Sequence, residues 1–266
     1  MLDWVAVSPV FRRGYGYRFD LTEYFPPAIK TICIACVSVF FLQKLSALLF
    51  PLNGDRFCLT WFGLVPYAAV FGFRIWQPFT YLFLHAGVLH ILFNLLYLAM
   101  FGADLERTWG SRKFYIYYFV CGVGAGIITI IVKLIIDPHG QGSALIPTIG
   151  ASGAIYGVLL ATAVVMPHRQ VWVFPLPVTV SMRVFVAVLG AIEFFATIGS
   201  SGDAVSHVCH LGGMLVGYIY LRRGSYLYGF RNSVSDWQRR RLKKKFEVYV
   251  REHRDKPPSN PDNWVN

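Results

Sequence analysis

Long apolar runs with few charged residues alternate along this chain with short polar connections. A bilayer core is about 30 Å thick, and a helix that rises about 1.5 Å per residue needs roughly 20 apolar residues to cross it. The pattern predicts six such helices, at residues 29–50, 81–101, 114–136, 150–166, 178–198 and 204–221. We therefore expect an all-α polytopic membrane protein built as a six-transmembrane-helix bundle.

The first connection, residues 51–80, is too polar and too often interrupted by glycine and proline to form a further span. It nevertheless contains several aromatic residues, among them Trp61 and Trp76. Because tryptophan favours the membrane–water interface, this connection is expected to be partly membrane-embedded. We divide the chain into a cytoplasmic N-terminal segment (1–27), a six-helix core (28–222) and a basic cytoplasmic tail (223–266).

Composition supports the membrane class, and charge predicts the orientation. Hydrophobic residues make up 55% of the chain and charged residues only 15%, whereas about a quarter of the residues in soluble proteins are charged. Of the net charge of +11, +7 lies between Arg222 and the C-terminus, where there are 12 Lys/Arg and 5 Asp/Glu. The third and fifth connections, residues 137–149 and 199–203, contain no Lys or Arg, whereas residues 1–27 and the second and fourth connections do. By the positive-inside rule we expect a multi-pass protein with both termini in the cytoplasm. We expect the membrane to be a bacterial inner membrane and the basic tail to contact its anionic lipid.

Polar side chains inside the predicted helices gather at one depth. In this topology the second, fourth and sixth helices all run inward from the outer face, so their N-terminal turns share one level. Ionisable side chains within spans are costly and usually functional. The residues concerned are His85, His90 and Asn94, then Ser152, and finally His207 and His210.

Ser152 is predicted to open the fourth helix, with Gly150 before it and Gly153 after it. The first turn of a helix offers backbone N–H groups without intrahelical partners, which can hold a developing oxyanion. Small residues at such a position are also common simply because membrane helices pack tightly there.

Glycine spacing predicts which helices meet. Gly153-x3-Gly157 in the fourth helix and Gly213-x3-Gly217 in the sixth offer matching small surfaces that allow close approach. His210 shares its stripe with Gly213, so this contact is expected to bring His210 to the serine of the fourth helix.

These residue types favour acyl transfer. A serine hydroxyl needs an adjacent base at neutral pH, and a neutral imidazole is the usual one, so we assign Ser152 as nucleophile and His210 as general base. The Ser152 N–H, the Asn94 amide and the His90 ring are candidate donors to the oxyanion.

No acidic residue that could complete a catalytic triad is identified at the membrane depth of Ser152 and His210. Asp203 lies only at the margin of that depth. Arg183 and Glu193 of the fifth helix are interpreted as structural or snorkelling residues. We therefore predict a Ser–His dyad. Tyr156, four residues after the serine, is predicted to stack on the imidazole.

At these residues the chain resembles the rhomboid intramembrane serine proteases. The motifs that carry the resemblance, over about residues 71–221, are His85-x4-His90-x3-Asn94, Gly102-x3-Glu106-x3-Gly110, Gly150-x-Ser152-Gly153 and His210-x2-Gly213-x3-Gly217.

The resemblance implies that Ser152 is the nucleophile and His210 the base, with His90 and Asn94 in the oxyanion hole and Tyr156 packed on the imidazole. It also implies hydrolysis of membrane-spanning protein substrates near the bilayer face without metal or cofactor. The resemblance further implies that the fifth helix or its cap gates the entry of substrate to the site. Relatives often have Trp-Arg before the second span, where this chain has Trp76-Gln77-Pro78; this departure concerns the anchoring of the first connection and not the dyad.

Other functions fit the sequence less well than protease activity. Cys33-x2-Cys36 and His207-x2-His210 have zinc-like spacing, but the topology separates the two pairs by on the order of 15 Å, so no metal site is predicted. The basic run 239–245 is assigned to lipid rather than nucleic acid. A transporter would place polar groups at the midplane of paired halves, which are not evident. A rhomboid-like pseudoprotease that binds membrane clients without cleaving them is the alternative; the presence of both dyad residues argues against it.

Overall fold

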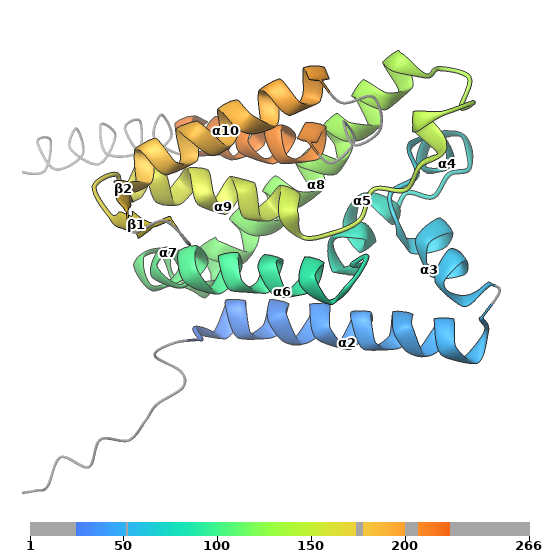
Figure 1. The fold of residues 1–266 in the computed structure, drawn as a ribbon, viewed down its shortest axis with the longest axis horizontal. Coiled ribbons are helices and arrows are strands. Elements are labelled where there is room, and N and C mark those ends of the chain that lie inside the picture. Colours follow the sequence, from blue (N-terminus) through green and yellow to red (C-terminus); the bar gives the residue numbers. More distant parts are fainter. Residues whose placement is uncertain (1–24, 52, 174–177, 200–206, 224–266) are drawn as a thin grey trace, which may run out of the picture.

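The computed structural model describes residues 25–51, 53–173, 178–199 and 207–223, and most of them are helical (Figure 1). The predictions for residues 1–24, for the fifth connection and for the basic tail after residue 223 lie outside these ranges. The elements are α2 (Pro27–Leu49), α3 (Gly54–Phe62), α4 (Pro66–Phe71), α5 (Gln77–Thr80), η1 (Tyr81–Phe83), α6 (Val88–Tyr97), η2 (Leu98–Gly102), α7 (Ala103–Trp109), α8 (Ser111–Ile136), η3 (Ser143–Leu145), α9 (Ser152–Val165), β1 (Gln170–Trp172), β2 (Thr179–Ser181), α10 (Met182–Gly199) and a helix at 207–223.

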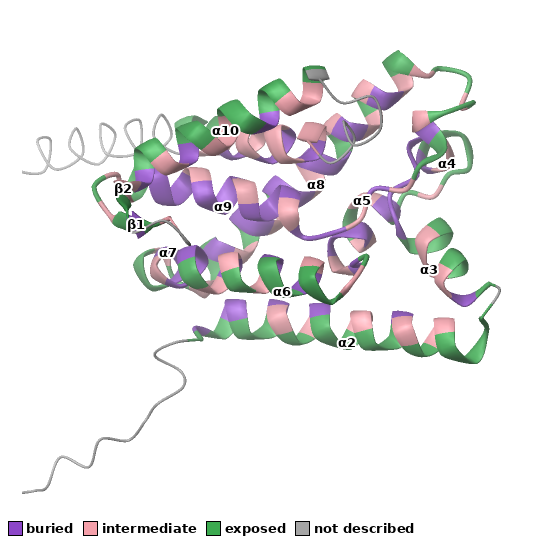
Figure 2. Ribbon diagram, in the orientation of Figure 1, coloured by how far each residue is buried: buried purple, intermediate pink, exposed green. Residues whose placement is uncertain are grey.

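Helix α9 lies at the centre of the bundle. Figure 1 shows it between α6 and α10, and it also packs closely against α8. Ala154, Val158 and Ala161 on α9 are fully buried, and Figure 2 shows most of this helix buried. An uncharged helix enclosed by protein in this way needs no amphipathic pattern, and apart from Ser152, Tyr156 and Thr162 its residues are apolar on every side.

The outward faces of the surrounding helices are apolar too. Phe41 and Leu48 on α2, Ile135 on α8 and Phe195 on α10 are all at least 65% exposed. Continuous exposed apolar surface of this kind marks contact with lipid rather than water. Three described helices are long and apolar enough to cross a membrane: Pro27–Leu49, Val88–Trp109 and Ser111–Ile136, while Ser152–Val165 is apolar but shorter. The all-α polytopic class is confirmed.

Two predicted helix starts are wrong. The second long helix begins at Val88 rather than at residue 81, because Tyr81–Phe83 forms a separate 3-10 turn and the chain is extended at Leu84 and Gly87. The fifth helix begins at Met182 rather than at residue 178.

The fourth connection contains a short antiparallel hairpin that the sequence analysis missed. Strands β1 and β2 pair Gln170 with Ser181 and Val171 with Val180. Thr179 and Val180 are β-branched and favour a strand, although hydropathy alone assigned them to the following helix.

Gln77, at the position where the sequence departs from the Trp-Arg pattern noted above, anchors the first connection. Its side chain is fully buried, its Oε1 accepts from the Val65 N–H at 3.0 Å, and its Nε2 donates to the Thr60 carbonyl at 2.9 Å. Arg74 donates to the same Thr60 carbonyl and lies 4.3 Å from the Trp61 ring. An uncharged amide and a nearby guanidinium therefore hold this connection together.

Glu106 caps the N-terminus of α2 from another helix. Its two carboxylate oxygens accept from the backbone N–H groups of Ala28 at 2.8 Å and Ile29 at 3.0 Å, and the Ser111 hydroxyl donates to it at 2.6 Å. The side chain is only 2% exposed. Negative charge at a helix N-terminus satisfies free N–H groups and complements the helix dipole, so Glu106 fastens α2 to the bundle.

We expect Glu106→Ala to lower the free energy of unfolding by about 2 kcal/mol, because buried N–H groups lose their charged acceptor. The measurement is reversible unfolding in detergent. Asp104→Ala is the control: that carboxylate lies on the same helix in partly exposed pairs with Arg107 and Arg169, which are worth at most about 1 kcal/mol each. Equal losses in the two variants would contradict the capping role.

Candidate active site

Three helices contribute polar side chains to one cavity of about 300 Å³. They are His90, Asn94 and Tyr97 of α6, Ser152 and Tyr156 of α9, and His210 of the helix at 207–223, and Thr148 joins them from the turn before α9. The rest of the wall is largely apolar and includes Phe93, Leu159 and Leu189. The residues that the sequence analysis proposed for catalysis and for the oxyanion hole therefore share one cavity.

The serine and the histidine are in direct contact. His210 Nε2 lies 2.7 Å from Ser152 Oγ, a normal distance for a hydrogen bond from the hydroxyl to a neutral imidazole. The Tyr156 ring stacks on His210 with the ring centroids 4.2 Å apart and the planes 8° from parallel. Because Ser152 is the first residue of α9, its own backbone N–H has no partner within the helix.

Glycines set the separation of the two helices that carry this pair. A Cβ on Gly213 would lie 1.8 Å from the Gly153 carbonyl oxygen, so the two backbones touch directly. One turn further along, a Cβ on Gly217 would lie 3.4 Å from Gly157 Cα and 2.5 Å from the Tyr117 hydroxyl. Only residues without side chains permit this approach.

Gly150 lies against the candidate oxyanion donors. Its φ of +116° is unfavourable for any residue with a side chain, and a Cβ there would lie 2.9 Å from His90 Nε2 and 3.8 Å from Asn94 Nδ2. Asn94 is 7% exposed and its Nδ2 has no hydrogen-bond partner within the described chain. A buried donor left unpaired is costly, and beside a nucleophile it is suited to receive charge that develops during a reaction.

The turn before the serine is held by backbone pairing and a buried lysine. Thr148 and Leu64 exchange two backbone hydrogen bonds of 2.8 and 2.9 Å, and the Gly150 N–H donates to the Tyr81 carbonyl at 2.9 Å. Lys133, 3% exposed, donates to Thr148 Oγ1 at 3.2 Å. The position of Ser152 thus depends on the first connection as well as on α8.

Glu193 is the residue that the sequence analysis missed. It is 7% exposed, so the interpretation as a snorkelling side chain is wrong. Tyr156 donates its hydroxyl to Glu193 Oε1, His207 Nδ1 lies 2.5 Å from Oε2, and His210 Nδ1 lies 3.0 Å from Oε1. The last contact is close, but its geometry is not that of an aligned hydrogen bond.

A usable signal for Glu193 was present in the topology. The fifth helix runs opposite to the fourth and sixth, so its C-terminal part lies level with their N-terminal turns. Glu193 is near that end, whereas Arg183 is near the other. If the membrane depths of side chains are compared for the fifth helix as they were for the second, fourth and sixth, Glu193 lies at the level of the candidate site residues.

His85 does not line the cavity. It is fully buried in the turn before α6, where its Nδ1 lies 3.2 Å from the Phe83 carbonyl and its backbone N–H donates to Gln43 Oε1. Its ring lies edge-on to His90, with 5.2 Å between centroids. His85 therefore packs against His90 without lining the cavity and supports the position of its ring.

Among the described residues, the ligand atoms of Glu193, His207 and His210 are close enough to share a cation, within 4.8 Å of one another. Each is already engaged by the protein, since the carboxylate oxygens face the two imidazoles and the tyrosine hydroxyl. A cation at this position would have to replace these contacts.

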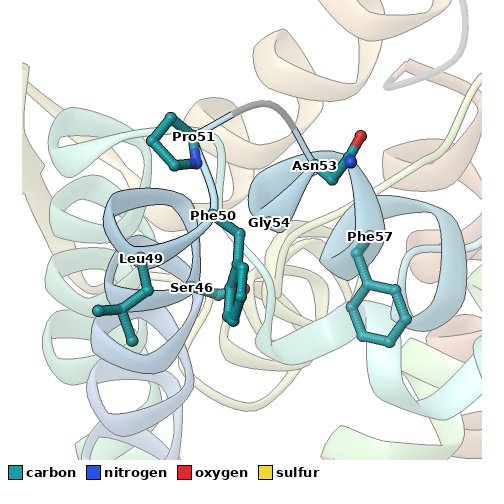
Figure 3. Close-up of a pocket in the computed structure, with 7 residues that line it drawn as sticks. All are labelled: Ser46, Leu49, Phe50, Pro51, Asn53, Gly54 and Phe57. Atoms are coloured by element: carbon teal, nitrogen blue, oxygen red, sulfur yellow. The ribbon is translucent and has the colours of Figure 1, made fainter.

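A larger cavity of about 580 Å³ lies at the turn between α2 and α3 (Figure 3). Leu49, Phe50, Pro51 and Phe57 form most of its lining. It contains no acidic side chain, histidine or cysteine, so it offers no acid–base chemistry comparable to that of the smaller cavity.

Comparison with known proteins gives one consistent result. The family model described as "Rhomboid domain" matches residues 72–226. The chain is 30% identical over 116 residues to "Rhomboid protease GlpG" of Salmonella choleraesuis (strain SC-B67), covering 44% of this chain and 39% of that protein. It is 26% identical over 155 residues to "RHOMBOID-like protein 1" of Arabidopsis thaliana, covering 58% of this chain and 37% of that one. The matches thus span less than half the length of these relatives.

Gly213→Ala is expected to destabilise the bundle by about 2–3 kcal/mol, because its Cβ would overlap the Gly153 carbonyl and force two helices apart. Thermal unfolding in detergent measures the effect. The matched control is Gly190→Ala on α10, where the new Cβ would make ordinary contact with Met214 at 3.6 Å. A melting temperature for Gly213→Ala equal to that of the control would show that the backbones are not in contact.

Proposed function

The chain belongs to the rhomboid family, and on that basis we propose that it is an intramembrane serine protease that hydrolyses peptide bonds of membrane-spanning proteins. Ser152 is the nucleophile and His210 the general base. The observation that carries the proposal is the 2.7 Å contact between Ser152 Oγ and His210 Nε2 inside a cavity of the apolar bundle.

In the first step, Ser152 Oγ attacks the scissile carbonyl carbon while its proton passes to His210 Nε2. The new O–C bond forms as the carbonyl oxygen becomes an oxyanion. The Ser152 N–H, the Asn94 amide and the His90 ring donate to this oxygen, and one such donor is typically worth about 3 kcal/mol in a site without bulk water.

In the second step, the C–N bond breaks and His210 returns the proton to the leaving amine, which leaves an acyl ester on Ser152. Water then attacks the ester carbonyl carbon while His210 accepts a proton from it. The ester C–O bond breaks, His210 returns the proton to Ser152 Oγ, and the carboxylic acid product leaves. Every proton transfer uses side chains of this chain, so the proposed mechanism requires no metal or cofactor.

The proposed substrates are helices that can unwind locally. A helical peptide bond keeps its carbonyl within the backbone hydrogen-bond ladder, and a nucleophile has to reach that carbon. We therefore expect cleavage at segments that contain small, helix-destabilising residues near the bilayer face.

The proposed setting is a bacterial inner membrane, with both termini in the cytoplasm and residues 28–222 as the catalytic core. The basic tail would contact anionic lipid rather than nucleic acid.

The test combines a fluorophosphonate probe with mass spectrometry of a single-span substrate in detergent or liposomes. Wild type is expected to be labelled and to cleave, whereas Ser152→Ala should lose labelling and His210→Ala should lose at least about 10³-fold in rate. Both variants should keep a melting temperature near that of wild type, since neither side chain fills the core.

Ser143→Ala is the matched control, because Ser143 precedes the same helix but does not line the cavity. Cleavage by Ser152→Ala would contradict the assigned nucleophile. A folded wild type that binds the substrate without labelling or cleavage would instead support the pseudoprotease alternative.

A further inference from the structure

Glu193 is a carboxylate in a helix that is otherwise apolar around it. Ile192 and Phe194 on either side are more than 50% exposed on the outer face of α10, whereas Glu193 points inward and is 7% exposed. Removing a carboxylate from water costs several kcal/mol unless donors and opposite charge replace the lost solvation. The contacts of Glu193 therefore need to account for its presence.

Within the part of the chain that the structure describes, the close contacts of this side chain all lead to the candidate site. Tyr156 reaches it from α9, and His207 and His210 reach it from the helix at 207–223. Tyr156 also stacks on His210, so the carboxylate, the phenol and the imidazole form one cluster. No other Asp or Glu of the described residues is within this cluster.

The serine contact determines the tautomer of His210. Nε2 faces the Ser152 hydroxyl at 2.7 Å and has to be unprotonated to accept its proton. The ring proton of the neutral imidazole is then on Nδ1, which lies 3.0 Å from Glu193 Oε1. A carboxylate at this distance favours that tautomer and stabilises the imidazolium that forms when Nε2 takes a second proton.

We propose that Glu193 is a positioning residue for His210 and makes the site a Ser–His–Glu arrangement rather than a dyad. The inference rests on the proposed protease function. Glu193 itself stays ionised and takes no proton: the serine proton moves to Nε2 and later to the leaving amine. Tyr156 and His207 orient the carboxylate by donating to its two oxygens.

The imprecise alignment of the His210–Glu193 contact fits a resting site, since catalytic hydrogen bonds are often poorly aligned before substrate binds. Of the described residues, those that face His210 are Ser152 and Tyr156 on α9, His90 on α6, Glu193 on α10 and His207 on its own helix. Only Glu193 among them supplies negative charge, so the counter-charge of the imidazolium depends on it.

The experiment compares wild type with Glu193→Gln and Glu193→Asp on one cleavable single-span substrate, with kcat, KM and melting temperature measured for each. Glu193→Gln keeps the shape but removes the charge, and kcat is expected to fall about ten- to a hundredfold, the factor that one charge-assisted hydrogen bond represents, while KM changes less than about twofold. Glu193→Asp restores the charge and should recover several-fold of the kcat lost.

Thr197→Val is the control for disturbance of α10, because Thr197 lies one turn away and, among the described residues, its hydroxyl bonds the Glu193 backbone carbonyl rather than a side chain of the site. It should leave kcat within about twofold of wild type. If Glu193 only held α10 against its neighbouring helices, the result would differ: Glu193→Gln would lower the melting temperature or change KM while kcat stayed constant.

Three results would overturn the inference. An active wild type with an equally fast Glu193→Gln refutes it while leaving the proposed protease intact. A wild type that cleaves nothing refutes both. Loss of wild-type activity with 1,10-phenanthroline, restored by added zinc, would assign Glu193, His207 and His210 to a metal ion instead.

Discussion

Direct contact between two helix backbones underlies the candidate site. Gly213 lies so close to the Gly153 carbonyl that a single methyl group would not fit between them. In a bilayer, helices gain little from hydrophobic association with one another, and close backbone packing takes its place. The distance between Ser152 and His210 follows from this contact, because each side chain projects from the turn next to it.

Around that contact, buried polar side chains hold helix ends and turns in place through hydrogen bonds. Glu106 caps α2, Gln77 holds the first connection and Lys133 holds the turn that leads to Ser152. In each case the partner is a backbone or hydroxyl group that apolar surroundings would otherwise leave without a hydrogen bond, at a cost of several kcal/mol. Among the described residues, several other buried polar atoms also lack a hydrogen-bond partner, but Asn94, unlike His85, Tyr118 and Ser143, lines the cavity that contains Ser152.

Much of the architecture could be predicted because its causes are local. Apolar runs about 20 residues long predict spans, and the spacing of Gly153-x3-Gly157 and Gly213-x3-Gly217 predicts which faces meet. The start of α6 could not be placed, because residues 81–83 are apolar yet form a separate turn whose position depends on α8 and Gly150. Hydropathy likewise does not distinguish a β-branched hairpin from the helix that follows.

Glu193 and Gln77 show why the remainder escaped prediction. Each is a polar residue whose partners lie far away in the sequence: Tyr156 and His210 for the one, Thr60 and Val65 for the other. Depth could have placed Glu193 level with the candidate site, but a pattern along one helix does not show which side chains of another helix a polar residue contacts. The same reasoning did bring His90, Asn94, Ser152 and His210 together, because their depth could be inferred for each helix separately.

The shortness of α9 has a consequence for where water can be. Its 14 residues rise only about 21 Å, whereas a hydrocarbon core is about 30 Å thick. If Val165 lies at one edge of that core, the hydroxyl of Ser152 ends roughly 9 Å short of the other. On that placement the hydroxyl lies within the thickness of the core rather than at its surface, so water has to reach it through the cavity that His90, Asn94 and His210 line.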